Sequence, residues 1–332
     1  MHIMAYGLDW HVSQQSSAFH DLVFSPLAPY MKIDFHVYRQ PLRIASEETV
    51  IFCQIIPPLD LPSYTNVIWI PMWDQMRMFP QAWWNRLPKT MRVVAFSDAI
   101  YQRSMAAGLR VLPLRYFKNP AAFSPVEWSQ GRTLFYWNRT GLVSADFLAK
   151  LCGALKIDKL LFRDQTDPDY DDRAYFTLPL KLGRTLVEKL PVFTDREAYW
   201  RATTSANIVI APRPVEGVGV TLLEAMARGC AVFAYNAPAM NEYIETSRTG
   251  YLFKHRWTPR RLRRGVQARL AEHGLAPHPP FAHTINRADQ DWDQIANLEL
   301  QKLGENARSA HHVGFAKWET KIPDLAQFLS SR

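Results

Sequence analysis

The segment Glu216-Gly-Val-Gly-Val-Thr-Leu-Leu-Glu224 places a glycine-rich loop between two carboxylates. An apolar run typical of a strand, residues 206–211, comes just before it. A helix is predicted over residues 222–228, and a second apolar strand follows at residues 231–235. A strand, a glycine-rich loop and a helix in this order form an anion site, because the free amide groups and the dipole of the first helical turn attract phosphate.

The two carboxylates of this segment suit a nucleotide-sugar. Glu224, on the first helical turn, can accept hydrogen bonds from a ribose diol, and Glu216, on the loop, can reach a sugar beyond the diphosphate. The amides of Val220 and Thr221 are the expected donors to the diphosphate. A structural alternative stays open, because Thr221 and Glu224 also have the spacing of a capping box with Thr221 as N-cap.

A dinucleotide fingerprint is a competing interpretation that the spacing disfavours. Gly217 and Gly219 supply two of its three glycines, but Leu222 occupies the position of the third. Asn236 stands at the end of the next strand, where the fingerprint expects an acidic ribose ligand. The sequence therefore predicts a poor NAD site.

The residues around the motif resemble a known family. Residues 211–230 resemble the Glu-x7-Glu segment of the retaining GT-B glycosyltransferases, and the chain is similar to glycosyltransferase family 4. Residues 133–139 resemble the strand that opens the family's second domain, and residues 304–308 resemble part of its closing helices. The resemblance runs from about Gly131 to the C-terminus. The N-terminal third matches in outline only.

Apolar runs alternate with helical stretches along the whole chain, which predicts parallel α/β sheets. The fold class expected from this pattern and the resemblance is α/β, of GT-B type, with two Rossmann-like domains facing a cleft and a C-terminal helix packing back on the N-terminal domain. The expected parts are an acceptor-side domain (residues 1–122), a nucleotide-sugar-binding domain (123–312) and the returning helix (313–332). The proline-rich residues 113–125 are interpreted as the linker.

The individual elements are predicted from periodicity and from helix start and stop signals. Strands are predicted at residues 3–7, 33–38, 49–56, 66–71, 92–96, 133–136, 158–162, 190–193, 206–211, 231–235 and 250–253. Helices are predicted at residues 19–30, 99–107, 196–203 and 222–228, and residues 290–329 are expected to be mainly helical. The face of the returning helix is expected to carry Phe315, Trp318, Leu325 and Phe328.

The resemblance implies transfer of a hexose from a nucleotide-diphosphate sugar, with retention of anomeric configuration and without a metal. By that analogy Glu216 orients the donor sugar and shields positive charge, and Glu224 holds the ribose. The whole loop between them is expected to bind the donor: Gly217, Val218, Gly219, Val220 and Thr221. The nucleobase is expected near Phe193.

The family's phosphate clamp also has an Arg and a Lys at the start of the second domain. Arg139 matches the Arg, although it is also interpretable as a surface arginine on a loop. Ser144 stands where the Lys is expected, which leaves Lys150 or Arg163 as substitutes without motif support. This departure from the family pattern puts the clamp in doubt.

The N-terminal domain offers weaker candidates for the acceptor or sugar. Asp9 and His11 lie in a polar loop, predicted over residues 9–17, and are interpretable either as ligands or as ordinary loop residues. Trp73 belongs to a tryptophan-rich segment, residues 69–84, that fits either a sugar- or lipid-binding face or a core. Two further polar segments are interpreted without a functional role: Asp167-Pro-Asp169 as a solvated acidic loop, and His311-His312 as helix surface.

Composition indicates a folded, intracellular chain. The 332 residues are 48% hydrophobic and 21% charged, which is typical of globular proteins and excludes a disordered chain. Cys53, Cys152 and Cys230 are odd in number and lack metal-site spacing, so buried thiols are expected. No signal peptide or membrane span is expected, and the predicted location is the cytoplasm.

The net charge of +8 is concentrated in one segment, where seven Lys and Arg residues lie between Lys254 and Arg269. Thr258-Pro259 has the pattern of a helix start, so a basic amphipathic helix is predicted there. A solvated surface helix and a helix attracted to anionic lipid are both open, and the second implies a peripheral protein at the inner face of the membrane. A nucleic-acid partner is not expected, because no recognition motif is present.

Two functions from different classes follow. The first is a retaining, metal-independent glycosyltransferase that acts on a glycan or lipid-linked acceptor in cell-surface polysaccharide synthesis. It needs no cofactor, since the nucleotide-sugar is a substrate. The second is a non-catalytic GT-B protein that binds a glycan or supports a partner enzyme, and the missing Lys and the altered N-terminal loop motivate it.

Overall fold

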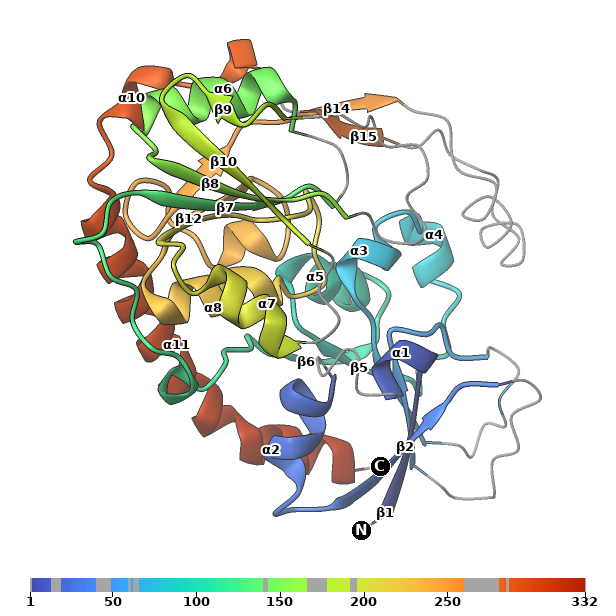
Figure 1. Ribbon diagram of the computed structural model, residues 1–332. Helices are drawn as coiled ribbons and strands as arrows, with labels where there is room; N and C mark the ends of the chain where they lie inside the picture. Colours follow the sequence, from blue (N-terminus) through green and yellow to red (C-terminus); the bar gives the residue numbers. More distant parts are fainter. Residues whose placement is uncertain are drawn as a thin grey trace.

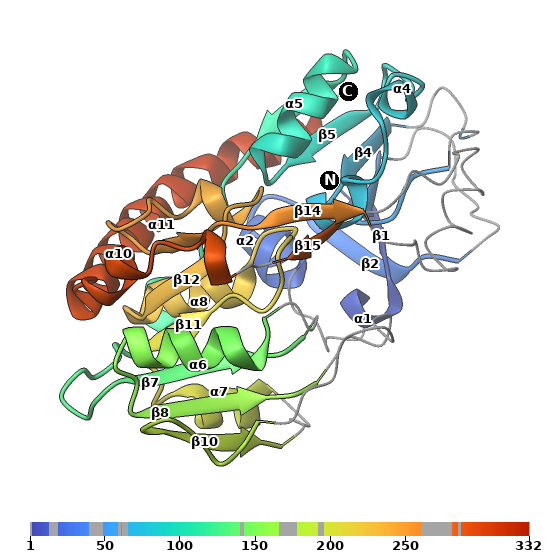
Figure 2. The same cartoon turned by 90° about the horizontal axis from the view of Figure 1, so that it is seen from above.

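The computed structural model describes residues 2–12, 19–39, 49–58, 61, 66–139, 143–165, 178–191, 196–259, 281–284 and 287–331. Within them, two mainly parallel sheets form two α/β domains that share one long C-terminal helix, α11 (Leu300–Ser330) (Figure 1). The chain passes between the domains through the coil after β6 and again along α11 (Figures 1 and 2).

The first sheet has six parallel strands in the order β2-β1-β3-β4-β5-β6. Their bounds are His2–Gly7 (β1), Lys32–Val37 (β2), Thr49–Cys53 (β3), Asn66–Ile70 (β4), Arg92–Ala95 (β5) and Arg110–Pro113 (β6). The first five were predicted within a few residues. β6 lies where no strand was predicted; it is only four residues long and ends at Pro113, where the proline-rich segment begins.

The second sheet has the order β13-β12-β11-β7-β8-β10-β9, and only β9 is antiparallel to its neighbour in this described part of the chain. Its strands are Thr133–Trp137 (β7), Lys159–Arg163 (β8), Lys181–Leu182 (β9), Thr185–Leu190 (β10), Ile208–Ile210 (β11), Ala231–Tyr235 (β12) and Tyr251–Phe253 (β13). The strand predicted at residues 190–193 was wrong in position. β10 ends at Leu190, and residues 192–195 lie outside the described residues.

The helices of the first domain are short. A π-helical turn, η1 (His20–Phe24), and α2 (Ser25–Leu27) replace the single helix predicted at residues 19–30. The other helices are α1 (Asp9–Val12), α3 (Trp73–Met76), α4 (Gln81–Trp84) and α5 (Asp98–Ala106). The predicted loop at residues 9–17 was therefore wrong at its start, which forms α1, and residues 13–18 are not described.

The second domain has α6 (Ala145–Ala154), α7 (Arg196–Thr203) and α8 (Val220–Arg228) beside its sheet, and α10 (Trp292–Ala296) precedes α11 (Figure 2). Short 3-10 turns form η2 (Pro120–Ala122), η3 (Met240–Glu242) and η4 (Arg287–Asp289). α7 has the predicted bounds, whereas α8 begins two residues before the predicted helix, so Glu224, which was expected on the first turn, lies beyond it.

The tryptophan-rich segment is core. Trp69, Trp83 and Trp84 are fully buried and their rings pack on one another, with Trp69 and Trp84 centroids 5.2 Å apart. The segment was interpreted either as a sugar- or lipid-binding face or as core, and the structure supports core packing for these three side chains. The three cysteines are free and buried, as expected.

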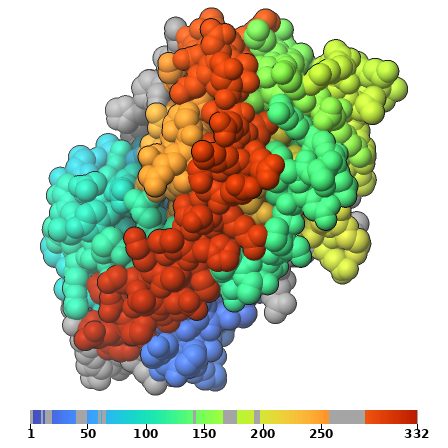
Figure 3. Space-filling view, turned by 90° about the vertical axis from the view of Figure 1, so that its left-hand side faces the viewer, coloured from blue at the N-terminus to red at the C-terminus, as the bar shows by residue number. Residues whose placement is uncertain are grey.

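α11 packs back on the first domain, as predicted, and Figure 3 shows it crossing the face of the molecule between the two domains. Trp318 contacts Phe96 and Tyr116, and Phe328 lies under the guanidinium of Arg92. Leu325 is also buried. The predicted domain boundaries stay predictions, although residue 312 lies inside this continuous helix.

Two glycines let α11 approach other backbone closely. A Cβ at Gly304 would lie 2.2 Å from the carbonyl oxygen of Gly229, which ends α8 in the left-handed conformation. A Cβ at Gly314 would lie 2.2 Å from the ring of Phe117, on the coil that connects the domains. Phe117 also contacts His311, so the interpretation of His311 as helix surface was wrong. Burial lowers the pKa of His311 to about 4.

The basic segment does not begin as a helix. Residues Arg256–Pro259 form β14, which pairs antiparallel with β15 (Phe281–Thr284). Thr258-Pro259 as a helix start was therefore wrong: β-branched and aromatic residues favour the strand, and Pro259 is tolerated because it is the terminal residue of β14. Residues 260–280 lie outside the described residues. No helix in the described part of the chain is long and apolar enough to cross a membrane.

Candidate functional site

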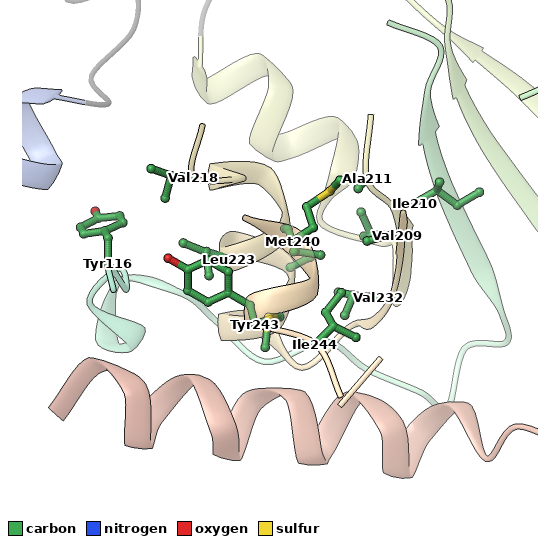
Figure 4. Close-up of a cluster of buried hydrophobic side chains, with 14 of the residues drawn as sticks. Tyr116, Val209, Ile210, Ala211, Val218, Leu223, Val232, Met240, Tyr243 and Ile244 are labelled. Atoms are coloured by element: carbon green, nitrogen blue, oxygen red, sulfur yellow. The ribbon is translucent and has the colours of Figure 1, made fainter. Parts of the chain in front are cut away.

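The glycine-rich loop leaves β11 and enters α8, as predicted. Gly219 is the N-cap of α8 in the left-handed conformation, with φ 78°, which glycine adopts without strain. Thr221 is therefore inside the first helical turn, and the capping box with Thr221 as N-cap was wrong. Val218 and Leu223 point into a buried cluster with Tyr116 and Tyr243, beside α11 (Figure 4). This packing fixes the direction in which α8 presents its free amides.

Glu224 forms an ion pair with a residue that sequence reasoning missed. Lys118, on the coil between the domains, lies with its Nζ 2.5 Å from Glu224 Oε1. The two side chains are only 8% and 12% exposed, so this charge-assisted hydrogen bond is well shielded from water. The carboxylate predicted to hold a ribose is thus oriented from the connecting coil.

Glu216 is held from within its own loop. Arg213 donates from Nε to Glu216 Oε1 at 3.1 Å and from Nη2 to Oε2 at 2.5 Å, a two-pronged contact that fixes the carboxylate in orientation. Arg213 Nη1 also lies 3.6 Å from Asp74 Oδ2, on α3 of the other domain. Two carboxylates from opposite domains therefore share one guanidinium.

The two domains touch at the carboxyl ends of their strands. Met72 follows β4, Gly217 follows β11, and a Cβ at Gly217 would lie 3.0 Å from Met72 Cβ. Farther along the same edges, Arg115 pairs with Glu242, which follows β12, at 3.0 Å. The candidate site thus lies where the carboxyl ends of two parallel sheets face each other, which is the usual ligand position in open α/β sheets.

Arg139 lies at the same edge, just beyond β7. Its guanidinium stacks on Trp137 with 4.7 Å between Cζ and the ring centroid, and Arg163, at the end of β8, lies over the same ring at 4.0 Å. Ser144 accepts a hydrogen bond from the amide of Phe147 at 3.1 Å and is the N-cap of α6. Lys150 is exposed on α6 over Trp292, whereas Arg163 is buried and donates to Gln165 Oε1.

A small cavity lies between α7 and α8, next to Glu224. Its lining includes Tyr199, Thr221 and Arg228. Burial, together with the charge of Glu224, raises the pKa of the Tyr199 hydroxyl well above its usual range, so this hydroxyl is neutral. The predicted base-binding residue Phe193 lies outside the described residues, just before α7.

The N-terminal domain supplied three weaker candidates for the acceptor or sugar, and the structure does not place all of them at the glycine-rich loop. Asp9 is the exposed first residue of α1, and the side chain of His11 is not described. Trp73 is buried under the guanidinium of Arg103, with 5.1 Å between Cζ and the ring centroid. Its position next to Asp74 puts it near the site, but its ring is a packing surface.

Within the described residues, no three His, Cys, Asp or Glu side chains converge in a way that would hold a metal ion. Asp167-Pro-Asp169 lies outside those residues.

The signals that sequence reasoning missed are of different kinds. Arg213 stands three residues before Glu216, a spacing that brings side chains together within a tight loop or helical turn. Asp74 lies in the tryptophan-rich segment, where the aromatic side chains drew the interpretation. Lys118 lies in the segment interpreted as a linker, where no site residue was expected.

Comparisons with known proteins agree with this architecture. Residues 189–278 match the family described as Glycosyl transferases group 1. The structure of Anabaena Alr3699/HepE in complex with UDP superposes with a TM-score of 0.61 at 13% identity, covering 100% of both chains. The chain has the GT-B fold. No curated protein sequence matches it significantly.

Other GT-B structures align over nearly the whole chain. Sucrose-phosphate synthase (tll1590) from Thermosynechococcus elongatus gives a TM-score of 0.60 at 14% identity, covering 99% of both chains. The lipopolysaccharide outer core galactosyltransferase WaaB, in its apo form, gives 0.50 at 13% identity, also covering 99% of both chains. The matched segment contains the whole glycine-rich loop from Arg213 to Glu224.

Proposed function

We propose that this GT-B protein is a retaining, metal-independent glycosyltransferase of hexosyltransferase type. It takes a sugar from a nucleotide-diphosphate sugar and transfers it to a glycan or lipid-linked acceptor. The observation that carries the proposal is the pair of shielded carboxylates, Glu216 and Glu224, on either side of the free amides of α8. The UDP bound by the structurally similar Anabaena HepE supports a nucleotide-sugar as donor.

Each part of the donor has a partner of suitable chemistry. The ribose diol donates to Glu224, which Lys118 orients. The diphosphate accepts from the amides of Val220 and Thr221 and from the guanidinium of Arg139. The base lies beside α7, at the small cavity lined by Tyr199 and Thr221.

The chemical step separates a diphosphate from the anomeric carbon. The carbon–oxygen bond to the phosphate breaks with both electrons going to the phosphate oxygen, and the amides and Arg139 stabilise that charge. Glu216 faces the positive charge that develops on the sugar. The acceptor hydroxyl attacks from the face that the phosphate leaves, and its proton goes to the departing phosphate oxygen.

Binding of nucleotides tests the proposal directly. Calorimetry with UDP, GDP, ADP and CMP, with EDTA present, is expected to show one nucleotide that binds the wild type. Glu224→Ala is expected to weaken that nucleotide at least about tenfold, because a shielded charged hydrogen bond to the ribose is lost. Glu245→Ala, at an exposed carboxylate paired with Arg248, is the matched control.

The rival function is a non-catalytic GT-B protein that binds a glycan or supports a partner enzyme. The observation that favours it is Ser144, which caps α6 where the clamp lysine is expected. A wild type that binds none of the four nucleotides would favour the rival and overturn the transferase.

Lys118 provides a second test of the nucleotide site. Lys118→Met is expected to weaken the nucleotide about tenfold, because Glu224 loses the partner that holds it toward the ribose. Lys302→Met, at an exposed position of α11, should leave the affinity unchanged. Equal affinities of Lys118→Met and wild type would show that the ion pair plays no part in binding.

The role in cell-surface polysaccharide synthesis and the position at a membrane surface belong to this proposal as well. The basic residues between Lys254 and Arg269 motivate attraction to anionic lipid. Sedimentation with phosphatidylglycerol vesicles at low and high salt measures it. Recovery of all protein in the supernatant at both salt concentrations would contradict it.

A further inference from the structure

A buried polar cluster joins the two domains next to the donor loop. It consists of Asp74 on α3, with Arg213 and Glu216 on the loop. The three side chains are 16%, 20% and 9% exposed, so the cluster is shielded but still reachable. The contact between Met72 and Gly217 and the packing of Val215 into the first domain's core hold the cluster from both sides.

The two carboxylates of the cluster use Arg213 unequally. Glu216 takes both short hydrogen bonds from the guanidinium. Asp74 Oδ1 accepts from the amide of Gln75 at 3.1 Å, whereas Oδ2 has Arg213 Nη1 at 3.6 Å, beyond hydrogen-bond length. Oδ2 therefore retains acceptor capacity on the side that faces the loop.

The charge of the cluster is not balanced by Arg213 alone. Burial and the charge of Glu216 raise the pKa of Asp74, while Arg213 and, to a smaller extent, Arg77 lower it. A group that donates hydrogen bonds to Oδ2 and accepts one from a guanidinium would stabilise this arrangement. Sugar hydroxyls do both, whereas phosphate only accepts and an ammonium only donates.

We propose that Asp74 and Arg213 form the half of the sugar subsite that lies opposite Glu216 and selects the sugar by its hydroxyls. The inference rests on the proposed function and deepens it. A hydroxyl of the transferred sugar donates to Asp74 Oδ2 and accepts from Arg213, while Arg213 keeps Glu216 in place. Glu216 is the residue that faces the reacting carbon, and Asp74 determines specificity.

This arrangement has a consequence for substrate choice. A site that hydrogen-bonds a hydroxyl rejects the analogue that lacks it, because the shielded acceptor is left unpaired. Removal of the matching hydroxyl from the sugar should therefore cost as much affinity as removal of the Asp74 charge, and the two losses should not add.

The test separates the sugar from the nucleotide. Dissociation constants are measured by calorimetry for UDP against UDP-glucose and for GDP against GDP-mannose, in wild type and Asp74→Asn. In Asp74→Asn we expect the nucleotide affinity to stay within about twofold, and the affinity gained from the sugar to fall by about tenfold. Monodeoxy analogues of the bound sugar are then measured to find the hydroxyl whose loss has no further effect in the variant.

Controls distinguish this role from a structural one. Asp324→Asn, at an exposed carboxylate of α11, should leave both affinities unchanged. Asp74→Glu keeps the charge but shifts the carboxylate, and it gives a second variant in case Asp74→Asn does not fold. It should change only the affinity difference between the nucleotide-sugar and the free nucleotide, which is the sugar gain. A sugar gain equal to wild type in the folded variant, or a fall in nucleotide affinity of the same size, overturns the inference. Failure of wild type to bind any nucleotide overturns the proposed function, and this inference with it.

Discussion

Glu216→Gln is expected to lower turnover of the nucleotide-sugar about 10²- to 10³-fold. The substitution keeps the shape of the side chain and removes the negative charge that faces the developing positive charge on the sugar. Nucleotide affinity should stay within about twofold, because the proposed contacts to the ribose and diphosphate lie at Glu224 and α8. The measurement is release of the nucleoside diphosphate from saturating nucleotide-sugar.

The matched control for this charge is Glu245→Gln, at an exposed carboxylate beyond η3. It should turn over at the wild-type rate. Turnover by Glu216→Gln within a few-fold of wild type would remove Glu216 from the chemical step. A parallel loss of nucleotide affinity would assign it to general integrity of the loop.

Gly304→Ala is expected to have the largest effect on stability. The added methyl group would lie 2.2 Å from the carbonyl oxygen of Gly229, which is backbone and cannot rotate away. α11 must therefore move off the end of α8, at a cost of roughly 2–4 kcal/mol in the free energy of unfolding. Urea unfolding followed by circular dichroism measures this difference.

Gly153→Ala in α6 is the matched control, because nothing lies within 4 Å of the added methyl group. Alanine is a better helix former than glycine, so this variant should be as stable as wild type or up to about 1 kcal/mol more stable. Equal stability of Gly304→Ala and Gly153→Ala would show that α11 adjusts freely against α8.

Much of the fold was predictable because local patterns determine it. β11, the glycine-rich loop and α8 have apolar periodicity and a glycine that alone fits the left-handed N-cap, so their order and direction were readable in one segment. The face of α11 was readable for the same reason, from Trp318, Leu325 and Phe328 at helical spacing.

The errors arose where tertiary contacts outweigh local pattern. Thr258-Pro259 has a helix-start signal, but pairing of β14 with β15 prevails. His311 is polar and next to His312, yet the approach of Phe117 at Gly314 buries it. Thr221 was expected to be the N-cap of α8, but Gly219 takes that position because the loop enters the helix through a residue in the left-handed conformation.

Only those residues of the candidate site that are close together in the sequence were predictable. Glu216 and Glu224 belong to one motif, whereas Lys118 reaches Glu224 across 106 positions of sequence. Asp74 meets Arg213 from the other domain. Periodicity and spacing carry no information about such pairs, because they depend on how the two sheets are placed against each other.

The seating of Phe117 against Gly314 and His311 has a mechanical consequence. Both covalent connections between the domains meet there, so a rotation of one domain against the other would turn about this contact. Such a rotation would displace the groups nearest the contact least. Lys118 follows Phe117 directly and pairs with Glu224. Because Glu224 is the proposed ribose ligand, binding of the proposed donor would act on the residue next to this contact.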